Sequence, residues 1–245
     1  MKDIPPPIIG VLGGMGPAAT VDFLRHVVEL MPAACDQDHL PLLVSSIPQI
    51  PDRTTAFLGL GESPLDALIA NGRRLVQAGA SVMVMPCNTA HLWFEPLQEA
   101  LGVPMLHIVD AALSEFDTDP GRTICVGLLA TEATILSGLY VDRSRKLLPG
   151  KTITWQLPAA DEIAHWIVPG IAAVKAGDTR RGRLYLMRAA RALIARGAAQ
   201  IVLGCTEIPL VLDQRRVKVP LIDANEALAK RAVAWGLGAF EKQPA

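Results

Sequence analysis

The sequence predicts an α/β fold made of two similar parallel-sheet domains, and three observations lead to this class. Short apolar runs alternate with segments of helical periodicity, which is the pattern of parallel sheets covered by helices on both faces. The composition is 51% hydrophobic but only 4% aromatic, which suits aliphatic strands and alanine-rich helices. A segment of the first half recurs in the second half, which indicates internal duplication.

The expected elements follow these runs along the chain. The first strand covers 7–13, and Pro17 begins a helix at the first helical position, which proline favours. Further buried strands are expected at 41–46, 81–86, 103–107, 123–129, 151–155, 199–204 and 219–222. Helices are expected between the strands, notably at 64–78, 89–101, 131–146, 160–176, 180–196 and 224–240.

The repeat centres on residues 78–89, AGASVMVMPCNT, which align with 196–207, RGAAQIVLGCTE, at an offset of 118. Residues 10–12 and 127–129, and 103–104 and 219–220, match at offsets of 117 and 116. Three matches in the same order indicate a duplication. Each half therefore places one cysteine at the carboxyl end of a strand.

Two similar halves predict two domains that face each other across a cleft holding the active site. The first covers 1–114 and the second 115–223, with the boundary in the polar stretch 114–122. The segment 224–245 carries the last helix, and the sequence leaves open whether this helix packs back onto the first domain.

Charge and composition exclude several classes of partner. The chain has 23 Lys and Arg against 24 Asp and Glu, a net charge of −1 with no evident basic stripe, so a nucleic-acid partner is not expected. The apolar runs at 8–15 and 199–204 are shorter than the ~20 residues that a bilayer demands. The N-terminal residues lack the apolar region of a signal peptide, so a cytoplasmic location is expected.

Four cysteines are widely spaced and form no Cys-x-x-Cys pair, so free thiols are expected in a reducing compartment. Cys125 lies within an apolar run and is interpreted as a buried hydrophobic residue. Cys35 lies in a polar loop, and no role is assigned to it. Cys87 and Cys205 follow strands, at the edge where open α/β sheets bind ligands.

Residues of helix-capping type follow both of these thiols: Asn88 and Thr89 on one side and Thr206 on the other. A helix N-terminus favours an anion, so the pKa of each thiol is expected to fall below its ordinary value of about 8.5. The free backbone N–H groups of Asn88, Thr89 and Ala90 would form a site for a substrate carboxylate.

Two near-equivalent thiols on either side of one carbon suit racemisation. One removes a proton as a thiolate while the other supplies a proton as a thiol, and the roles exchange in the reverse direction. Donors aimed at the carboxylate would stabilise the charge that develops in the transition state. The alternative is a pair of buried structural cysteines, which the small and capping residues beside each thiol disfavour.

Three motifs resemble the signatures of the aspartate/glutamate racemase superfamily: LGGMGP at 12–17, MPCNTAH at 85–91 and LGCTEIPL at 203–210. They occur in order over nearly the whole chain, and the aspartate racemase branch is the most similar. Glutamate racemases open with Asp-Ser-Gly and carry His after the second Cys-Thr, where this chain has Gly14-Met15 and Glu207. The resemblance implies a racemase acting on aspartate with no cofactor and no metal, and a homodimer.

The resemblance also implies further substrate-binding residues. Met15 lies in the first motif, and Thr131 matches a position that lines the cleft. Arg53, in a proline-rich segment, would bind the substrate's side-chain carboxylate bidentately, and Lys175 would supply a second positive charge. The alternative for Arg53 and Lys175 is a solvated surface charge, and for Thr131 a simple helix cap.

Other interpretations depend on weaker patterns. The glycines between 10 and 16 do not have the Gly-x-Gly-x-x-Gly spacing of a dinucleotide loop. A metal site of Cys87, His91 and Cys205 would lack closely paired ligands, so His91 is interpreted as a packing or surface residue. A glutamate or broad-range racemase, a maleate isomerase, a hydantoin racemase and a non-enzymatic amino-acid-binding module remain alternatives. The roles of Glu207 and His91 stay open.

Overall fold

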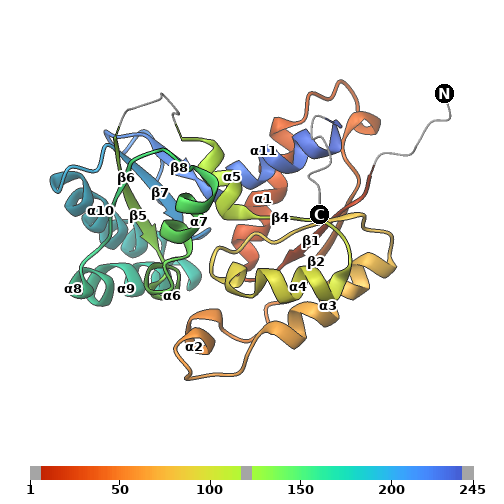
Figure 1. The fold of residues 1–245 in the computed structure, drawn as a ribbon, viewed down its shortest axis with the longest axis horizontal. Coiled ribbons are helices and arrows are strands. Elements are labelled where there is room, and N and C mark those ends of the chain that lie inside the picture. Colours follow the sequence, from red (N-terminus) through yellow and green to blue (C-terminus); the bar gives the residue numbers. More distant parts are fainter. Residues whose placement is uncertain (1–6, 117–122, 239–245) are drawn as a thin grey trace.

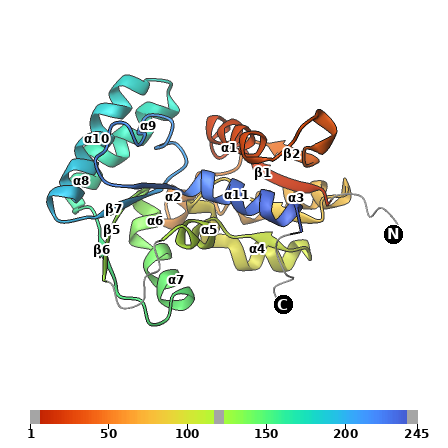
Figure 2. The ribbon, with the colours of Figure 1, turned by 90° about the horizontal axis from the view of Figure 1, so that it is seen from above.

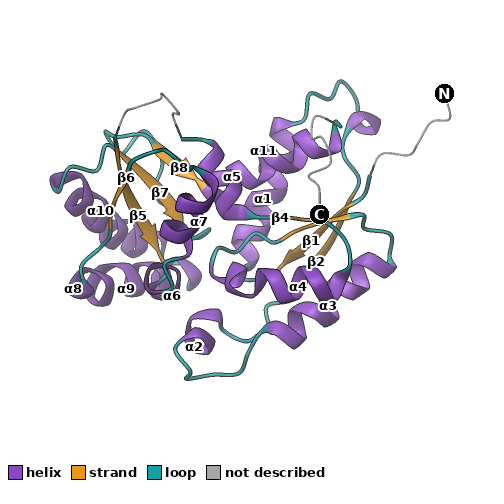
Figure 3. Cartoon of the chain, in the orientation of Figure 1, coloured by secondary structure: helices purple, strands orange, loops and turns teal. Residues whose placement is uncertain are grey.

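The computed structural model describes residues 7–116 and 123–238, and it contains two four-stranded parallel sheets flanked by helices (Figures 1 and 3). The first sheet has the order β2-β1-β3-β4, with β1 at Ile9–Gly13, β2 at Leu42–Ser46, β3 at Val82–Val84 and β4 at Met105–Leu106. The second has the equivalent order β6-β5-β7-β8, with β5 at Ile124–Ala130, β6 at Ile153–Gln156, β7 at Gln200–Gly204 and β8 at Leu221–Asp223. The α/β class is confirmed, and the matching strand order is what a duplication predicts.

Helices connect the strands of both sheets. In the first half they are α1 (Pro17–Leu30), η1 (Asp36–Asp38), α2 (Arg53–Phe57), α3 (Leu65–Gln77), η2 (Thr89–Trp93), α4 (Phe94–Leu101) and α5 (Ile108–Ser114). In the second half they are α6 (Glu132–Leu136), α7 (Leu139–Leu147), α8 (Ala160–Glu162), η3 (Ile163–Ile167), α9 (Val168–Lys175) and α10 (Thr179–Ala195). The last helix is α11 (Ala224–Gly236).

Two expected helices are interrupted. The helix expected at 131–146 is divided into α6 and α7 because Gly138 adopts a left-handed conformation with φ of 70°. The helix expected at 160–176 begins as α8, continues as the π-helical turn η3 and becomes α9, which carries a proline in its first turn. The five-residue helix α2 and the buried helix α5 were not expected.

The last helix joins the two halves. α11 follows β8 of the second sheet and packs against α1 and α5 of the first half (Figure 2). Asn225, at the start of α11, is fully buried and donates a hydrogen bond of 3.1 Å to the carbonyl oxygen of Ala19. One buried apolar cluster consequently contains side chains of both halves.

Three further expectations concern the domain boundary, the cysteines and the absence of a membrane span. Most of the expected boundary at 114–122 falls on residues 117–122, which lie outside the described residues. All four cysteines are free, but Cys125 is only half-buried, because it lies near the start of β5. In the described part of the chain, no helix has the length and apolar character that crossing a membrane requires.

Candidate active site

A small cavity lies where the carboxyl ends of strands from both sheets meet. Its lining consists of Met15, Asp52, Arg53, Thr54, Cys87, Asn88, Thr89, Thr131, Lys175, Cys205, Thr206 and Glu207. Its volume is about 20 Å³, room for about a single water molecule. Every residue that the sequence suggested for the site lines this cavity except Ala90, which is fully buried beside it.

Cys87 follows β3 and precedes the short 3₁₀-helix η2. Its side chain is buried, and burial raises the pKa of the thiol above its ordinary value. The positive charge of Arg53 and the backbone N–H of Ala90 act in the opposite direction. The backbone N–H of Ala90 thus favours the thiolate form of Cys87, although Ala90 does not line the cavity.

Cys205 follows β7, and its thiol donates a hydrogen bond of 3.1 Å to Oε2 of Glu207. Burial and the charge of Glu207 raise the pKa of Cys205 well above its ordinary value. The residues that follow Cys205 form turns and not the expected helix. The expectation that helix N-termini lower the pKa of both thiols is therefore wrong, because desolvation outweighs what a short helix supplies.

Glu207 also connects the two halves at this site. Its Oε1 accepts a hydrogen bond of 3.1 Å from the backbone N–H of Gly16, in the loop after β1. The side chain is buried, with 5% of its surface exposed. A buried carboxylate with one backbone donor and one thiol donor holds Cys205 in a fixed direction.

Two buried nitrogen donors at the cavity have no partner among the described residues. The hydroxyl of Tyr140 donates to Oδ1 of Asn88 at 2.5 Å, which leaves Nδ2 of Asn88 unpaired. Arg53, with 8% exposure, donates from one terminal nitrogen to the carbonyls of Ile50 and Pro51 at 3.1 and 3.0 Å, and its Nε is unpaired. Arg53 is hence no solvated surface charge. Unpaired buried donors are rare in folded proteins and mark a place for an acceptor.

Hydroxyl groups bridge the two halves on the other side of the cavity. Oγ1 of Thr89 lies 2.7 Å from Oγ1 of Thr131 and 3.1 Å from that of Thr134. Thr131 also caps α6 by accepting from the backbone N–H of Thr134 at 3.2 Å, so it is both a helix cap and a residue of the cavity lining. Thr206 donates to the carbonyl of Pro86 at 3.4 Å.

The remaining lining residues surround Arg53. Asp52 caps α2 by accepting from the backbone N–H groups of Thr54 and Thr55 at 3.0 and 2.9 Å. Lys175, the last residue of α9, is exposed. Its positive charge favours the ionised forms of Asp52 and of both thiols, and so opposes the effect of burial on their pKa. Sequence reasoning missed Asp52 and Thr54, although Asp followed by Arg-Thr-Thr is a helix-start pattern that would have revealed α2.

His91 is a packing residue, as the sequence suggested. Its Nε2 accepts from the backbone N–H of Ile108 at 3.1 Å, so its Nδ1 carries the proton and donates to the carbonyl of Cys87 at 2.8 Å. Burial lowers the pKa of His91 to about 4. Both ring nitrogens are occupied, which argues against a metal site of Cys87, His91 and Cys205.

Comparisons with known proteins agree with this geometry. Residues 12–232 match the family model of Asp/Glu/hydantoin racemases. The broad specificity amino-acid racemase RacX of Bacillus subtilis is 31% identical over 243 residues, which cover 93% of this chain and 97% of RacX. The structure of Picrophilus torridus aspartate racemase is similar with a TM-score of 0.79 and 30% identity, over 95% of this chain and 94% of that one.

A more distant structure is similar in fold alone. Glutamate racemase from Francisella tularensis, in complex with D-glutamate, has a TM-score of 0.67 and 16% identity, over 98% of this chain and 84% of that one. The family model covers most of the described residues, and the cavity lies between two sheets of the same topology. This chain belongs to the Asp/Glu/hydantoin racemase family.

Proposed function

We propose that this amino-acid racemase interconverts L- and D-aspartate without a cofactor, with Cys87 and Cys205 as the acid and base on opposite faces of the substrate's Cα. The observation that carries the proposal is the pair of buried thiols that line one cavity, one from each half of the chain. Their origin in equivalent strands, β3 and β7, supports equivalent chemical tasks.

The reaction needs one thiolate and one thiol. The thiolate of Cys87 removes the α-proton, so that the Cα–H bond breaks and an S–H bond forms. The thiol of Cys205 then gives its proton to the opposite face of the carbanion and becomes the thiolate. The reverse direction exchanges these roles. Glu207 holds the Cys205 thiol by the hydrogen bond of 3.1 Å and is a positioning residue.

The unpaired donors supply sites for the two carboxylates of aspartate. Nδ2 of Asn88, together with Thr89 and Thr206, would bind the α-carboxylate beside the thiols. Nε of Arg53 would bind the side-chain carboxylate, with Lys175 as a second positive charge. Donors that are already directed at the carboxylate stabilise the charge that develops when the α-proton leaves.

Aspartate is preferred over glutamate for two reasons. Gly14-Met15 and Glu207 stand where glutamate racemases carry Asp-Ser-Gly and His. The similar Picrophilus torridus protein is an aspartate racemase. The broad specificity of RacX supports a second candidate, a racemase that accepts several amino acids. The resemblance also supports a homodimer, which light scattering would test.

A chiral separation of products tests the proposal. Enzyme dialysed against a chelator, with no pyridoxal phosphate added, is incubated with aspartate, glutamate, alanine and lysine. Aspartate should be racemised with the highest kcat/KM, and Cys87→Ala and Cys205→Ala should each abolish turnover, whereas Cys35→Ala should retain it. Equal turnover of all four would favour the broad-range racemase, and activity that requires pyridoxal phosphate or metal would contradict the mechanism.

A further inference from the structure

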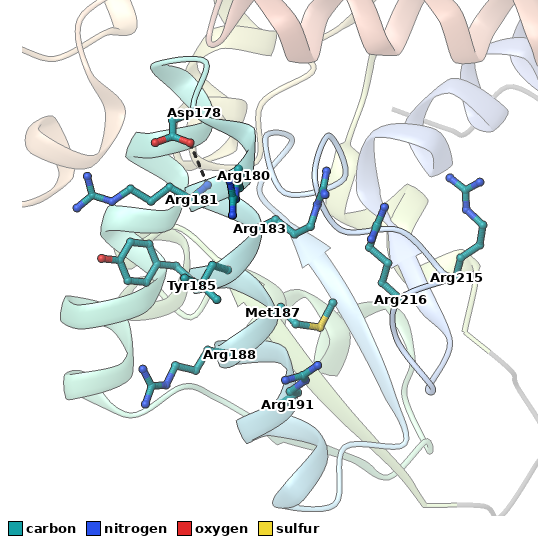
Figure 4. A pocket seen from close by; sticks show the side chains of 11 residues that line it. Asp178, Arg180, Arg181, Arg183, Tyr185, Met187, Arg188, Arg191, Arg215 and Arg216 are labelled. Carbon is teal, nitrogen blue, oxygen red and sulfur yellow. Dashed lines mark hydrogen bonds between the residues drawn. The ribbon is translucent and has the colours of Figure 1, made fainter.

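An arginine-rich groove lies outside the cavity of the two cysteines (Figure 4). It is bordered by α10 and by the loop that connects β7 to β8, and its volume is about 1060 Å³. Seven arginines line it, five on α10 and two, Arg215 and Arg216, on the facing loop. Asp178 is the only acidic residue among its described lining residues. No residue is shared with the cavity of Cys87 and Cys205.

Some arginines elsewhere in the molecule are paired with carboxylates. Arg25 lies 2.7 Å from Asp22, and Arg196 lies 2.7 Å from Glu162. The arginines on α10 that line the groove differ. In the described part of the chain, neither Arg180 nor Arg191 has a carboxylate within ion-pair distance.

The other groove arginines keep most of their donors available. Arg183 uses its Nε on a backbone carbonyl, that of Val211, at 3.2 Å. The guanidinium carbon of Arg188 lies 4.9 Å from the centre of the Trp166 ring, a cation–π contact, and no carboxylate of the described residues lies within ion-pair distance of Arg188. The loop arginines have an acidic neighbour in Asp213, and Arg181 has one in Asp178. The arginines therefore outnumber the nearby carboxylates, and the groove presents an excess of positive charge.

The fold concentrates this charge. Seven arginines, together with Asp178 of the lining and Asp213 beside the loop arginines, give the groove a net charge of +5, whereas the whole chain has a net charge of −1, so the rest of the chain carries −6. A local field of this kind attracts polyanions even when a protein is neutral overall. The expectation of no nucleic-acid partner was drawn from the net charge and from the lack of an evident basic stripe in the sequence, and neither reveals arginines that the fold brings together from α10 and the facing loop.

The spacing of the arginines along α10 indicates an elongated ligand. Arg180, Arg183, Leu184, Met187 and Arg191 share one face of the helix, and the 11 residue steps from Arg180 to Arg191 extend the row over about 16 Å. Leu184 is 70% exposed within this row. A row of cations interleaved with apolar side chains suits a chain of phosphates that carries flat apolar groups.

We propose that this groove binds a single strand of nucleic acid through its phosphates. Guanidinium groups bind phosphate bidentately and also stack on bases, which an ammonium group does not do. Among the described lining residues every cation is an arginine and none is a lysine. This composition favours a nucleic-acid strand over an acidic protein segment.

Fluorescence anisotropy with a labelled 20-nucleotide oligo-dT tests the proposal in the absence of amino-acid substrate, so its outcome is independent of the proposed racemase reaction. The groove variant carries Arg180→Gln, Arg188→Gln and Arg191→Gln. The matched control carries Arg73→Gln, Arg145→Gln and Lys146→Gln, three exposed cations on other helices that give the same change in net charge. Thermal melting establishes that both variants are folded.

The wild-type protein should bind oligo-dT, the groove variant should bind at least ten-fold more weakly, and the control should bind nearly as well as the wild type. Each lost phosphate contact lowers the slope of log K against log salt by about 0.7, so the groove variant should lose about 2 from this slope. Three results would overturn the proposal: no binding by the wild type, equal weakening in both variants, or displacement of oligo-dT by poly-L-glutamate at equal charge concentration.

Discussion

Cys87 and Cys205 have different surroundings at the residue scale, although they occupy equivalent strand ends. The Cys205 thiol donates to a carboxylate, whereas Cys87 is affected by the charge of Arg53 and by the N–H of Ala90. The pKa is raised for both thiols, but the carboxylate favours the protonated form of Cys205 more strongly. Cys205 therefore favours the thiol form, and Cys87 is the partner that ionises more readily.

Replacement of Glu207 by Gln should lower the pKa of Cys205. The variant removes a negative charge that disfavours the thiolate, so the thiolate should form at lower pH than in the wild type. Alkylation of Cys205 by iodoacetamide, followed by peptide mass spectrometry against pH, measures this shift, and exposed Cys35 controls for reagent activity. Glu99→Gln, an exposed residue of α4, should leave the profile unchanged. An unshifted Cys205 profile in Glu207→Gln would contradict the assigned role.

Arg53 is predicted to act on the substrate's side chain. A charged hydrogen bond is worth about 1.5–3 kcal/mol, so Arg53→Ala should lower kcat/KM for aspartate by at least roughly ten- to a hundred-fold. Because Arg53 also donates hydrogen bonds to two backbone carbonyls, its loss should lower the Tm as well. Steady-state kinetics and thermal melting, with exposed Arg73→Ala as the control, measure both effects. Unchanged aspartate kinetics in a folded variant would remove Arg53 from the site.

At the element scale, the sequence predicted long amphipathic elements well and short ones poorly. α1, α3 and α10 have one apolar face each and begin close to their expected positions. α2 has only five residues, too few for helical periodicity to appear. α5 has only seven residues, five of them buried and apolar, so no polar face marks it as an amphipathic helix.

The segment from η2 to α5 contains two buried neutral histidines, which predicts a pH dependence of stability. His91 has a pKa of about 4 in the folded protein and about 6.5 when unfolded, so the unfolded chain binds more protons below pH 6.5. The stabilisation is present above pH 6.5 and is lost as the pH falls toward 4, by about 3 kcal/mol in all. The pKa of His107 is lowered by burial in the same direction.

Urea unfolding between pH 7 and pH 4.5 measures this loss. His91→Gln should reduce the pH dependence, whereas exposed His165→Gln should not. Titration of the His91 ring by NMR in the wild-type protein gives a second measurement that does not depend on folding of the variant. A His91 pKa near 6.5 in the folded protein would refute the argument.

At the scale of the whole molecule, the site exists because the two halves meet. The repeat at an offset of 118 predicted that both cysteines lie at strand ends, and the structure brings them to one cavity. The contacts that hold the halves together were not predictable. Glu207 with Gly16 and Tyr140 with Asn88 join residues far apart in sequence, and no local pattern encodes such a pair.

The shared core predicts that the halves unfold together. α11 belongs to the second half by sequence but packs on α1 and α5, and one apolar cluster spans both sheets. Differential scanning calorimetry should show one transition with equal calorimetric and van't Hoff enthalpies. Two separated transitions would show that the halves are independent.

The central claim is that two different groups handle the two protons. Incubation of L-aspartate in deuterated water, with chiral separation and proton NMR at low conversion, tests it directly. Two bases predict that every molecule of D-aspartate carries deuterium at Cα, because its proton comes from the second, solvent-equilibrated thiol, while the remaining L-aspartate keeps its original proton. Protium retained in the product, or exchange in the recovered L-aspartate faster than racemisation, would show that one group handles both protons and would contradict the account.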